Sequence, residues 1–145
     1  MAVTYSIEMN APIERVFDYV EDTEKMKLWM DGLEETVYTS GRDPANPVGT
    51  KFKQRIREGG RVQEYDGEVL AYEKPKHLAV RIGNKYFHAV ADYRFTPVAE
   101  GTRLDYACDV TCHSWFVKVM GFLFGWFMKR ILRKHMTKLK DLAER

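Results

Sequence analysis

The C-terminal stretch from Ser114 to Arg145 constrains the fold of this chain most, because it predicts a single long helix. No proline interrupts it, and Ser114 is a suitable N-cap. At 1.5 Å per residue the helix would be roughly 45 Å long. An apolar stripe follows one face over the whole length: Val117, Gly121, Phe124, Gly125, Met128, Ile131, Leu132, Met136, Leu139, Leu142 and Ala143. The stripe predicts that this helix covers the core of the domain.

The opposite face of the same stretch changes character halfway along. Its second half is charged, as expected of a solvated surface, whereas its first half is apolar. A helix that is apolar on all sides must be covered on both faces by protein, ligand or lipid. Three explanations remain open for the first half: an anionic membrane surface, a second subunit of a homodimer, or burial within the same chain. The residues concerned are Trp115, Val119, Phe122 and Trp126.

Length and charge set further limits. With 145 residues the chain has the length of one domain, expected to span residues 1–145. The net charge of +2 gives no reason to expect nucleic-acid binding. Residues 113–145 hold eight basic and two acidic side chains, which suits an anionic surface or balances the acidic remainder. The N-terminus lacks the regions of a signal peptide, and the apolar run 115–128 is too short to span a bilayer, so we expect a cytoplasmic protein.

The rest of the chain predicts strands and two short helices. A strand is expected over residues 3–9, followed by a helix that starts near Pro12 and a second helix that is capped by Asp22 and ends at Gly32. Six more strands are expected at 33–39, 50–58, 61–73, 77–83, 86–96 and 102–111. Turn signals such as Gly59-Gly60 and Glu100-Gly101 join them closely, which is typical of an antiparallel meander.

Alternation of apolar and polar residues gives these strands an inner face. The stretch 61–73 allows two registers, and we favour the one that avoids burying three carboxylates. In that register the inward residues are Gln63, Tyr65, Gly67, Val69 and Ala71. A sheet with one apolar face needs a cover, and the long C-terminal helix is large enough to provide it. The predicted class is α+β: a helix-grip fold, with a seven-stranded antiparallel curved sheet wrapped around the long C-terminal helix and two short helices after strand 1.

Three segments carry a resemblance to a known superfamily. They read IEMNAPIERVFDYV at 7–20, followed by Trp29, then GEVLAYEKP at 67–75 and YRFTPVAEGT at 93–102. In these, and over essentially the whole chain, the sequence resembles the START-like (SRPBCC) superfamily of Bet v 1-type proteins, in particular its bacterial polyketide cyclase/dehydrase and lipid-transport-like branch. The resemblance implies a helix-grip domain for lipids, sterols, polyketides or plant hormones, with cyclisation or dehydration in some members. The shared positions are turns, caps and core residues, so they specify the fold better than the function.

Motifs for catalysis and metal binding give no signal. The sequence lacks a Gly-rich phosphate loop, His-Glu-x-x-His, Cys-x-x-Cys and Gly-x-Ser-x-Gly. The four histidines, at positions 77, 88, 113 and 135, have no partner at ligand spacing. Cys108 and Cys112 would lie about 13 Å apart along a strand, which predicts two buried reduced cysteines. We therefore expect no metal and no cofactor.

Polar residues on the predicted inner face are candidates for orienting a ligand. A buried tyrosine offers an apolar ring and one hydrogen-bonding tip. Each tyrosine taken singly is better explained as a core residue with its hydroxyl paired, but as a set that faces a helix with two glycines they favour a cavity. Gly121 and Gly125 each cost about 1 kcal/mol relative to Ala in a helix, which either makes room for a ligand or allows close packing or a kink. The candidate ligand-binding residues are Trp29, Phe52, Gln54, Tyr65, Val69, Ile82, Tyr93, Tyr106, Cys108, Gly121, Phe124, Gly125 and Met128.

Two functional hypotheses follow. The first is a carrier or sensor that binds a hydrophobic small molecule, such as a lipid, isoprenoid or polyketide-like compound, between the sheet and the C-terminal helix. The second is an enzyme of cyclase or dehydratase type, with Tyr65, Tyr93 or Tyr106 as acid or oxyanion donor. The thin catalytic signal favours the carrier.

Overall fold

The computed structural model describes residues 2–41, 46–58, 60–85, 87–112 and 121–145, and for Ala2, Glu58, Cys112 and residues 121–125 it describes the backbone alone. The strands are β1 (Ala2–Met9), β2 (Leu33–Tyr38), β3 (Lys51–Glu58), β4 (Arg61–Glu73), β5 (His77–Gly83), β6 (Phe87–Val98) and β7 (Gly101–Cys112). The helices are α1 (Ile13–Glu21), α2 (Thr23–Trp29) and α4 (Gly121–Ala143). Each predicted strand is present within two residues of its expected bounds. Helix α1 starts directly after Pro12 as predicted, and α2 ends at Trp29, three residues before Gly32.

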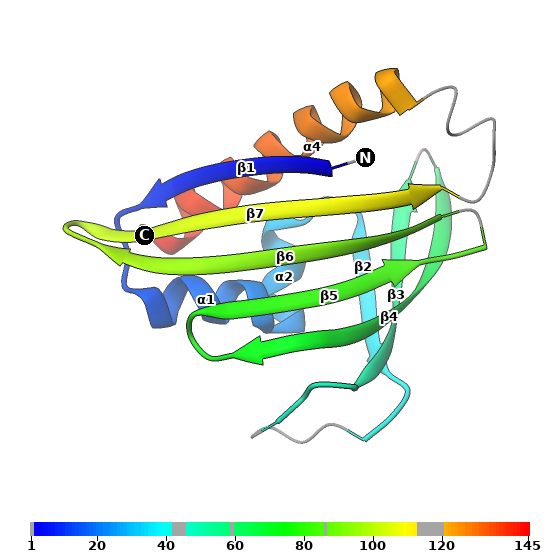
Figure 1. The fold of residues 1–145 in the computed structure, drawn as a ribbon, viewed down its shortest axis with the longest axis horizontal. Coiled ribbons are helices and arrows are strands. Elements are labelled where there is room, and N and C mark those ends of the chain that lie inside the picture. Colours follow the sequence, from blue (N-terminus) through cyan, green and yellow to red (C-terminus); the bar gives the residue numbers. More distant parts are fainter. Residues whose placement is uncertain (1, 42–45, 59, 86, 113–120) are drawn as a thin grey trace.

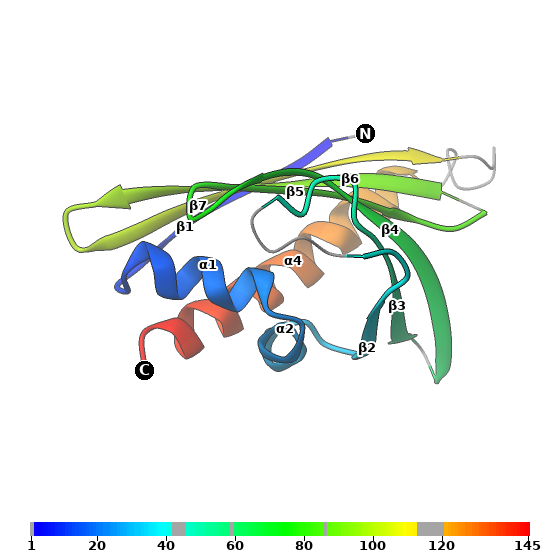
Figure 2. The same cartoon turned by 90° about the horizontal axis from the view of Figure 1, so that it is seen from below.

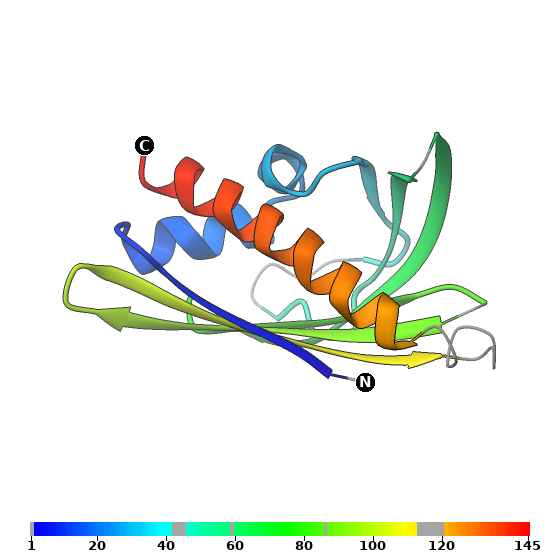
Figure 3. The same ribbon diagram turned by 90° about the horizontal axis from the view of Figure 1, so that it is seen from above.

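All seven strands form one antiparallel sheet in the order β1-β7-β6-β5-β4-β3-β2. The three helices lie on one side of it, and β2, β3 and β4 bend toward that side (Figures 1 and 2). Helix α4 crosses the sheet diagonally and packs against β1, α1 and α2 (Figure 3). The α+β helix-grip arrangement predicted from the sequence is therefore confirmed.

Local sequence signals explain where the short helices begin. Pro12 supplies the extended residue before α1, with φ of −62° and ψ of 149°. The Asp22 carboxylate accepts hydrogen bonds from the backbone N–H groups of Glu24 (2.9 Å) and Lys25 (3.2 Å), which caps α2. The far end of α4 is also held. The Arg15 guanidinium of α1 donates to the carbonyls of Ala143 (2.7 Å) and Arg145 (2.9 Å), where a helix leaves acceptors unpaired.

The second half of α4 covers the core as predicted. Its buried side chains are Leu132, Met136, Leu139 and Ala143. They join side chains from α1, α2 and the inner face of the sheet in one apolar cluster, which includes Val16, Phe17, Val20, Trp29, Phe95 and Leu104. The predicted helix start at Ser114 lies outside the described residues, as do Trp115, Val117 and Val119.

The predicted inner register of β4 is right in its first half and wrong at Ala71. Tyr65 and Val69 are buried, but the pairing with β5 shifts between Val69 and Ala71. One extra residue in a strand turns every later side chain to the other face. Tyr72 therefore faces inward, opposite Leu78, and Ala71 does not.

We expect His135 of α4 to make the stability of the fold depend on pH. Its Nε2 accepts a hydrogen bond from the Asp31 backbone N–H (3.2 Å), which requires the neutral imidazole. Burial lowers the pKa of His135; the Asp31 carboxylate opposes the shift, while Lys138 and Lys134 add to it. The unfolded chain then takes up this proton at higher pH than the folded chain, so acid favours unfolding.

We expect the free energy of unfolding to fall as the pH drops from about 6.5, the ordinary value of a histidine, and to level off below the folded-state pKa. Urea titrations between pH 7.5 and 5 measure this. His135→Gln, which keeps an acceptor but cannot be protonated, should flatten the decline. Lys138 and Lys134 lower the pKa of the Asp31 carboxyl. Protonation of Asp31 therefore reduces the free energy of unfolding only at lower pH. An equal decline in the variant would contradict the assignment to His135.

Candidate ligand cavity

A small apolar cavity lies between the two short helices and the bent part of the sheet. Its volume is about 50 Å³. Helices α1 and α2, strands β2 to β5 and the segment before β3 contribute its walls. No residue described in α4 lines it, so this cavity does not lie at the expected place between the sheet and the C-terminal helix. The lining residues are Val20, Glu21, Thr23, Met26, Thr36, Tyr38, Pro47, Phe52, Gln54, Val69, Tyr72, Leu78 and Val80. Most of this lining is apolar, so the cavity suits a hydrophobic group.

Polar atoms meet the cavity at two places. The buried Gln54 side chain donates from Nε2 to the Thr36 hydroxyl (3.3 Å) and to the Met26 sulfur (3.6 Å). At the other place, the Tyr72 hydroxyl donates to the Glu21 carboxylate. Among the described residues every fully buried side-chain nitrogen or oxygen has a hydrogen-bond partner. The polar wall is therefore satisfied in the absence of a ligand.

A close backbone approach shapes the same cavity. Phe52 of β3 lies opposite Gly67 of β4, and a Cβ at Gly67 would stand 2.3 Å from the Phe52 ring. The glycine leaves the space beside the neighbouring strand that this ring occupies. Any side chain at position 67 would push Phe52 toward the cavity.

A second group of aromatic residues lies on strands β4, β6 and β7. The rings of Tyr93 and Tyr106, on paired strands, stand edge to face with centroids 4.9 Å apart. Tyr65 lies 5.9 Å from Phe87. A second apolar cluster lies beside these rings. Its buried members are Ala89, Cys108 and Val110, and Ile82, Phe87 and Tyr106 pack against them. Tyr106 touches both this cluster and the main core.

Burial controls the acidity of this second group. It raises the pKa of Tyr93 and of Tyr106, and it also raises the pKa of the Cys108 thiol. The hydrogen bond between the Tyr106 and Cys108 side chains opposes this shift in part for the thiol. Both phenols are therefore protonated at neutral pH and suited to hydrogen-bond donation, and the thiol is a weak nucleophile.

The thirteen candidate ligand-binding residues do not form one site in the structure. Phe52, Gln54 and Val69 line the small cavity. Tyr65, Ile82, Tyr93, Tyr106 and Cys108 lie on the sheet face of the second aromatic group. Trp29 is a core residue whose indole N–H donates to the Tyr19 carbonyl (2.8 Å), and Met128 is partly buried on α4. Gly121, Phe124 and Gly125 belong to α4, where the structure describes their backbone alone.

Sequence reasoning missed four of the residues that give this cavity its polar or flexible character: Glu21, Met26, Thr36 and Tyr72. Tyr72 was missed because the bulge in β4 turns it to the inner face, and no residue type in that strand predicts a bulge. Glu21 ends α1 and reads as an ordinary surface carboxylate in the sequence. Its side chain is only 15% exposed because Tyr72 and Lys74 approach it, with Lys74 Nζ 3.7 Å from its carboxylate.

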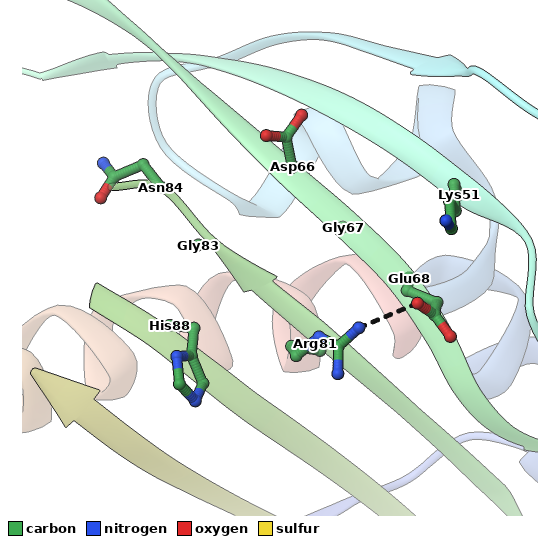
Figure 4. A pocket seen from close by; sticks show the side chains of 8 residues that line it. All are labelled: Lys51, Asp66, Gly67, Glu68, Arg81, Gly83, Asn84 and His88. Carbon is green, nitrogen blue, oxygen red and sulfur yellow. Dashed lines mark hydrogen bonds and ion pairs between the residues drawn. The ribbon is translucent and has the colours of Figure 1, made fainter. Parts of the chain in front are cut away.

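The outer face of the sheet has a larger but polar hollow of about 480 Å³ (Figure 4). It is lined by Lys51, Asp66, Gly67, Glu68, Arg81, Gly83, Asn84 and His88. Arg81 and Glu68 pair across it at 2.9 Å, and the helices lie behind the sheet in this view. His88 lines this hollow on the outer face of the sheet (Figure 4). A hollow lined by charges offers little to a hydrophobic ligand, so the inner cavity is the better candidate.

Comparison with protein families identifies the fold relatives. The family described as "Polyketide cyclase / dehydrase and lipid transport" matches residues 1–144. The chain belongs to this family. The resemblance to START-like proteins is thereby confirmed over the whole domain. A search of curated proteins finds no match. No helix in the described part of this family member is long and apolar enough to cross a membrane.

Solved structures share the fold of this family member at low sequence identity. A Mesorhizobium loti protein has a TM-score of 0.75 at 18% identity, covering 98% of this chain and 96% of its own. A Staphylococcus aureus protein of unknown function has a TM-score of 0.78 at 13% identity, covering 99% and 93%. The di-domain ARO/CYC StfQ from the steffimycin biosynthetic pathway has a TM-score of 0.76 at 13% identity, covering 99% of this chain and 49% of its own. At such identities the likeness describes the fold alone.

Proposed function

We propose that this protein binds a hydrophobic small molecule, such as a lipid, isoprenoid or polyketide-like compound, between the sheet and the helices. The observation that carries the proposal is the apolar cavity under α1 and α2, whose wall holds the Gln54 amide and the Glu21–Tyr72 pair. Apolar walls with a few placed polar groups are typical of ligand sites. The family description, which includes lipid transport, supports the same class of ligand.

Binding requires the walls to move. Typical ligand sites have volumes of roughly 300 to 1,000 Å³, whereas this cavity measures about 50 Å³. Met26 of α2 forms part of the cavity wall, with its sulfur next to the Gln54 amide. Its unbranched thioether side chain changes rotamer readily. We propose that a ligand displaces Met26 and extends from there under the sheet face that carries Tyr93 and Tyr106.

Titration with fluorescent fatty acids and polycyclic aromatic ligands tests the proposal. We expect saturable binding of one ligand per chain. Val69→Phe should weaken it by about tenfold or more, because the added ring fills the cavity. Val37→Phe is the matched control, since Val37 is 46% exposed on β2 and outside the cavity. No saturable binding of any ligand by the unaltered protein would contradict the proposal.

A second candidate is an enzyme of cyclase or dehydratase type. It is favoured by one observation, the Glu21 carboxylate held by Tyr72 in the wall of an apolar cavity, because a carboxylate and a phenol are groups that move protons. Incubation with linear polyketide thioesters, followed by mass spectrometry, would detect loss of water. Glu21→Gln should abolish that product while the protein still binds ligand. Ligand binding without any product favours the carrier instead.

A further inference from the structure

Two neighbouring aromatic side chains of α4 are exposed. Trp126 is 65% exposed and Phe127 is 53% exposed. Among the described residues the other exposed large apolar side chains are aliphatic and lie on other elements: Leu28, Val37, Val48 and Val62. Scattered aliphatic residues are normal on a protein surface, but two adjacent large rings mark a contact site.

The same helix carries a run of positive charge. Between Trp126 and Lys140 it has six basic residues and no acidic residue: Lys129, Arg130, Arg133, Lys134, Lys138 and Lys140. Lys134 and Lys138 bond to Asp31 at 3.0 and 2.5 Å. Lys129, Arg130 and Arg133 are exposed.

Helical spacing brings Trp126 and two of the exposed arginines together. Trp126, Arg130 and Arg133 are spaced by four and three residues, so they share one side of the helix. The Arg130 guanidinium stands over the Trp126 ring, 5.8 Å from its centroid. Figures 1 and 3 show this first part of α4 next to the ends of β1 and β7, at one extremity of the molecule. The combined surface of Trp126, Phe127, Lys129, Arg130 and Arg133 is called the aromatic–basic face below.

We propose that the aromatic–basic face binds the surface of an anionic lipid bilayer. Tryptophan and phenylalanine enter the boundary between headgroups and acyl chains, where exposed aromatic rings are stabilised. Lysine and arginine beside them are attracted to anionic headgroups. The inference stands on this surface alone and does not depend on ligand binding in the cavity.

Charge also argues against a second copy of the chain as the occupant. A two-fold interface places the same patch of each subunit against the other. The aromatic–basic face would then bring Lys129, Arg130 and Arg133 of two copies together without an acidic residue from this stretch to pair them. Like charges facing each other oppose association, whereas an anionic membrane satisfies them.

Sedimentation with vesicles tests the proposal. One preparation contains neutral phosphatidylcholine alone, and the other contains phosphatidylcholine and phosphatidylglycerol in a three-to-one ratio. We expect the protein to bind the anionic vesicles and to be released as salt rises, because the charges are exposed. Trp126→Ser combined with Phe127→Ser, and separately Arg130→Glu combined with Arg133→Glu, should each weaken binding by about tenfold or more.

Matched variants elsewhere on the surface serve as controls. Leu28→Ser removes an apolar side chain that is 53% exposed, as Phe127 is, and Arg61→Glu with Lys76→Glu reverses two exposed charges outside α4. Both should bind as the unaltered protein does, and circular dichroism checks that every variant is folded. Equal loss in the controls, or no binding of the unaltered protein to anionic vesicles, would overturn the proposal. So would a concentration-dependent dimer that Trp126→Ser abolishes.

Discussion

Replacing Phe17 by Ala is expected to lower the free energy of unfolding by about 3–5 kcal/mol. Phe17 is completely buried and stands edge to face with Phe95 (5.2 Å) and Tyr72 (5.7 Å). It thereby packs α1 against β4 and β6 on the inner face of the sheet. Removing the ring leaves a void that these strands cannot fill without moving, so the lost contacts and the void both destabilise the fold.

Urea unfolding of Phe17→Ala beside Leu28→Ala measures this effect. Leu28 lies on α2 and is 53% exposed, so its removal should change stability by no more than about 0.5 kcal/mol. Since Tyr72 packs on Phe17 and also bonds to Glu21, the variant should disturb the cavity wall as well. A loss below about 1 kcal/mol for Phe17→Ala would mean that the core rearranges around the void.

Gly32→Ala is expected to be the other severe change. Gly32 has a φ of +84°, and its carbonyl accepts a hydrogen bond from the Arg57 N–H at 2.7 Å. A Cβ there would stand 2.4 Å from the Arg57 carbonyl oxygen, which is backbone and cannot rotate away. The substitution must therefore separate the turn after α2 from β3, and we expect a loss of about 3 kcal/mol or more.

Gly60 provides a closely matched control for Gly32. Its φ is +82°, and a Cβ at this position would meet nothing within 4 Å. Gly60→Ala should cost only the left-handed backbone strain, about 1–2 kcal/mol. The difference between the two variants in thermal or urea unfolding measures the steric clash alone. Equal losses would show that the backbone conformation, and not the contact with Arg57, accounts for the effect.

The order and type of the elements followed from local patterns in the sequence. Alternation of apolar residues located the strands, and spacing of three and four residues located the helices, because side-chain direction depends on the local backbone period. Asp22 and Pro12 marked helix starts through their own hydrogen-bonding and backbone preferences. These are interactions between near neighbours, so a single chain displays them.

The candidate site was predictable in part. Phe52, Gln54 and Val69 follow directly from the inward register of β3 and β4. Tyr72 did not, because the bulge after Val69 is set by how β4 pairs with β5 while the sheet bends. The packing of the long helix confirmed its apolar stripe from Leu132 onward.

By itself, the sequence determined the α+β helix-grip fold and most positions of its core, since both depend on periodicity and on turns between adjacent elements. Only the tertiary structure decided that Glu21 of α1 and Tyr72 of β4 meet at one cavity wall, that Arg15 closes the end of α4, and that Trp126 is exposed. These features join residues that are far apart in the chain or depend on what surrounds a side chain. Contacts of that kind have no local period and arise only when the elements pack together.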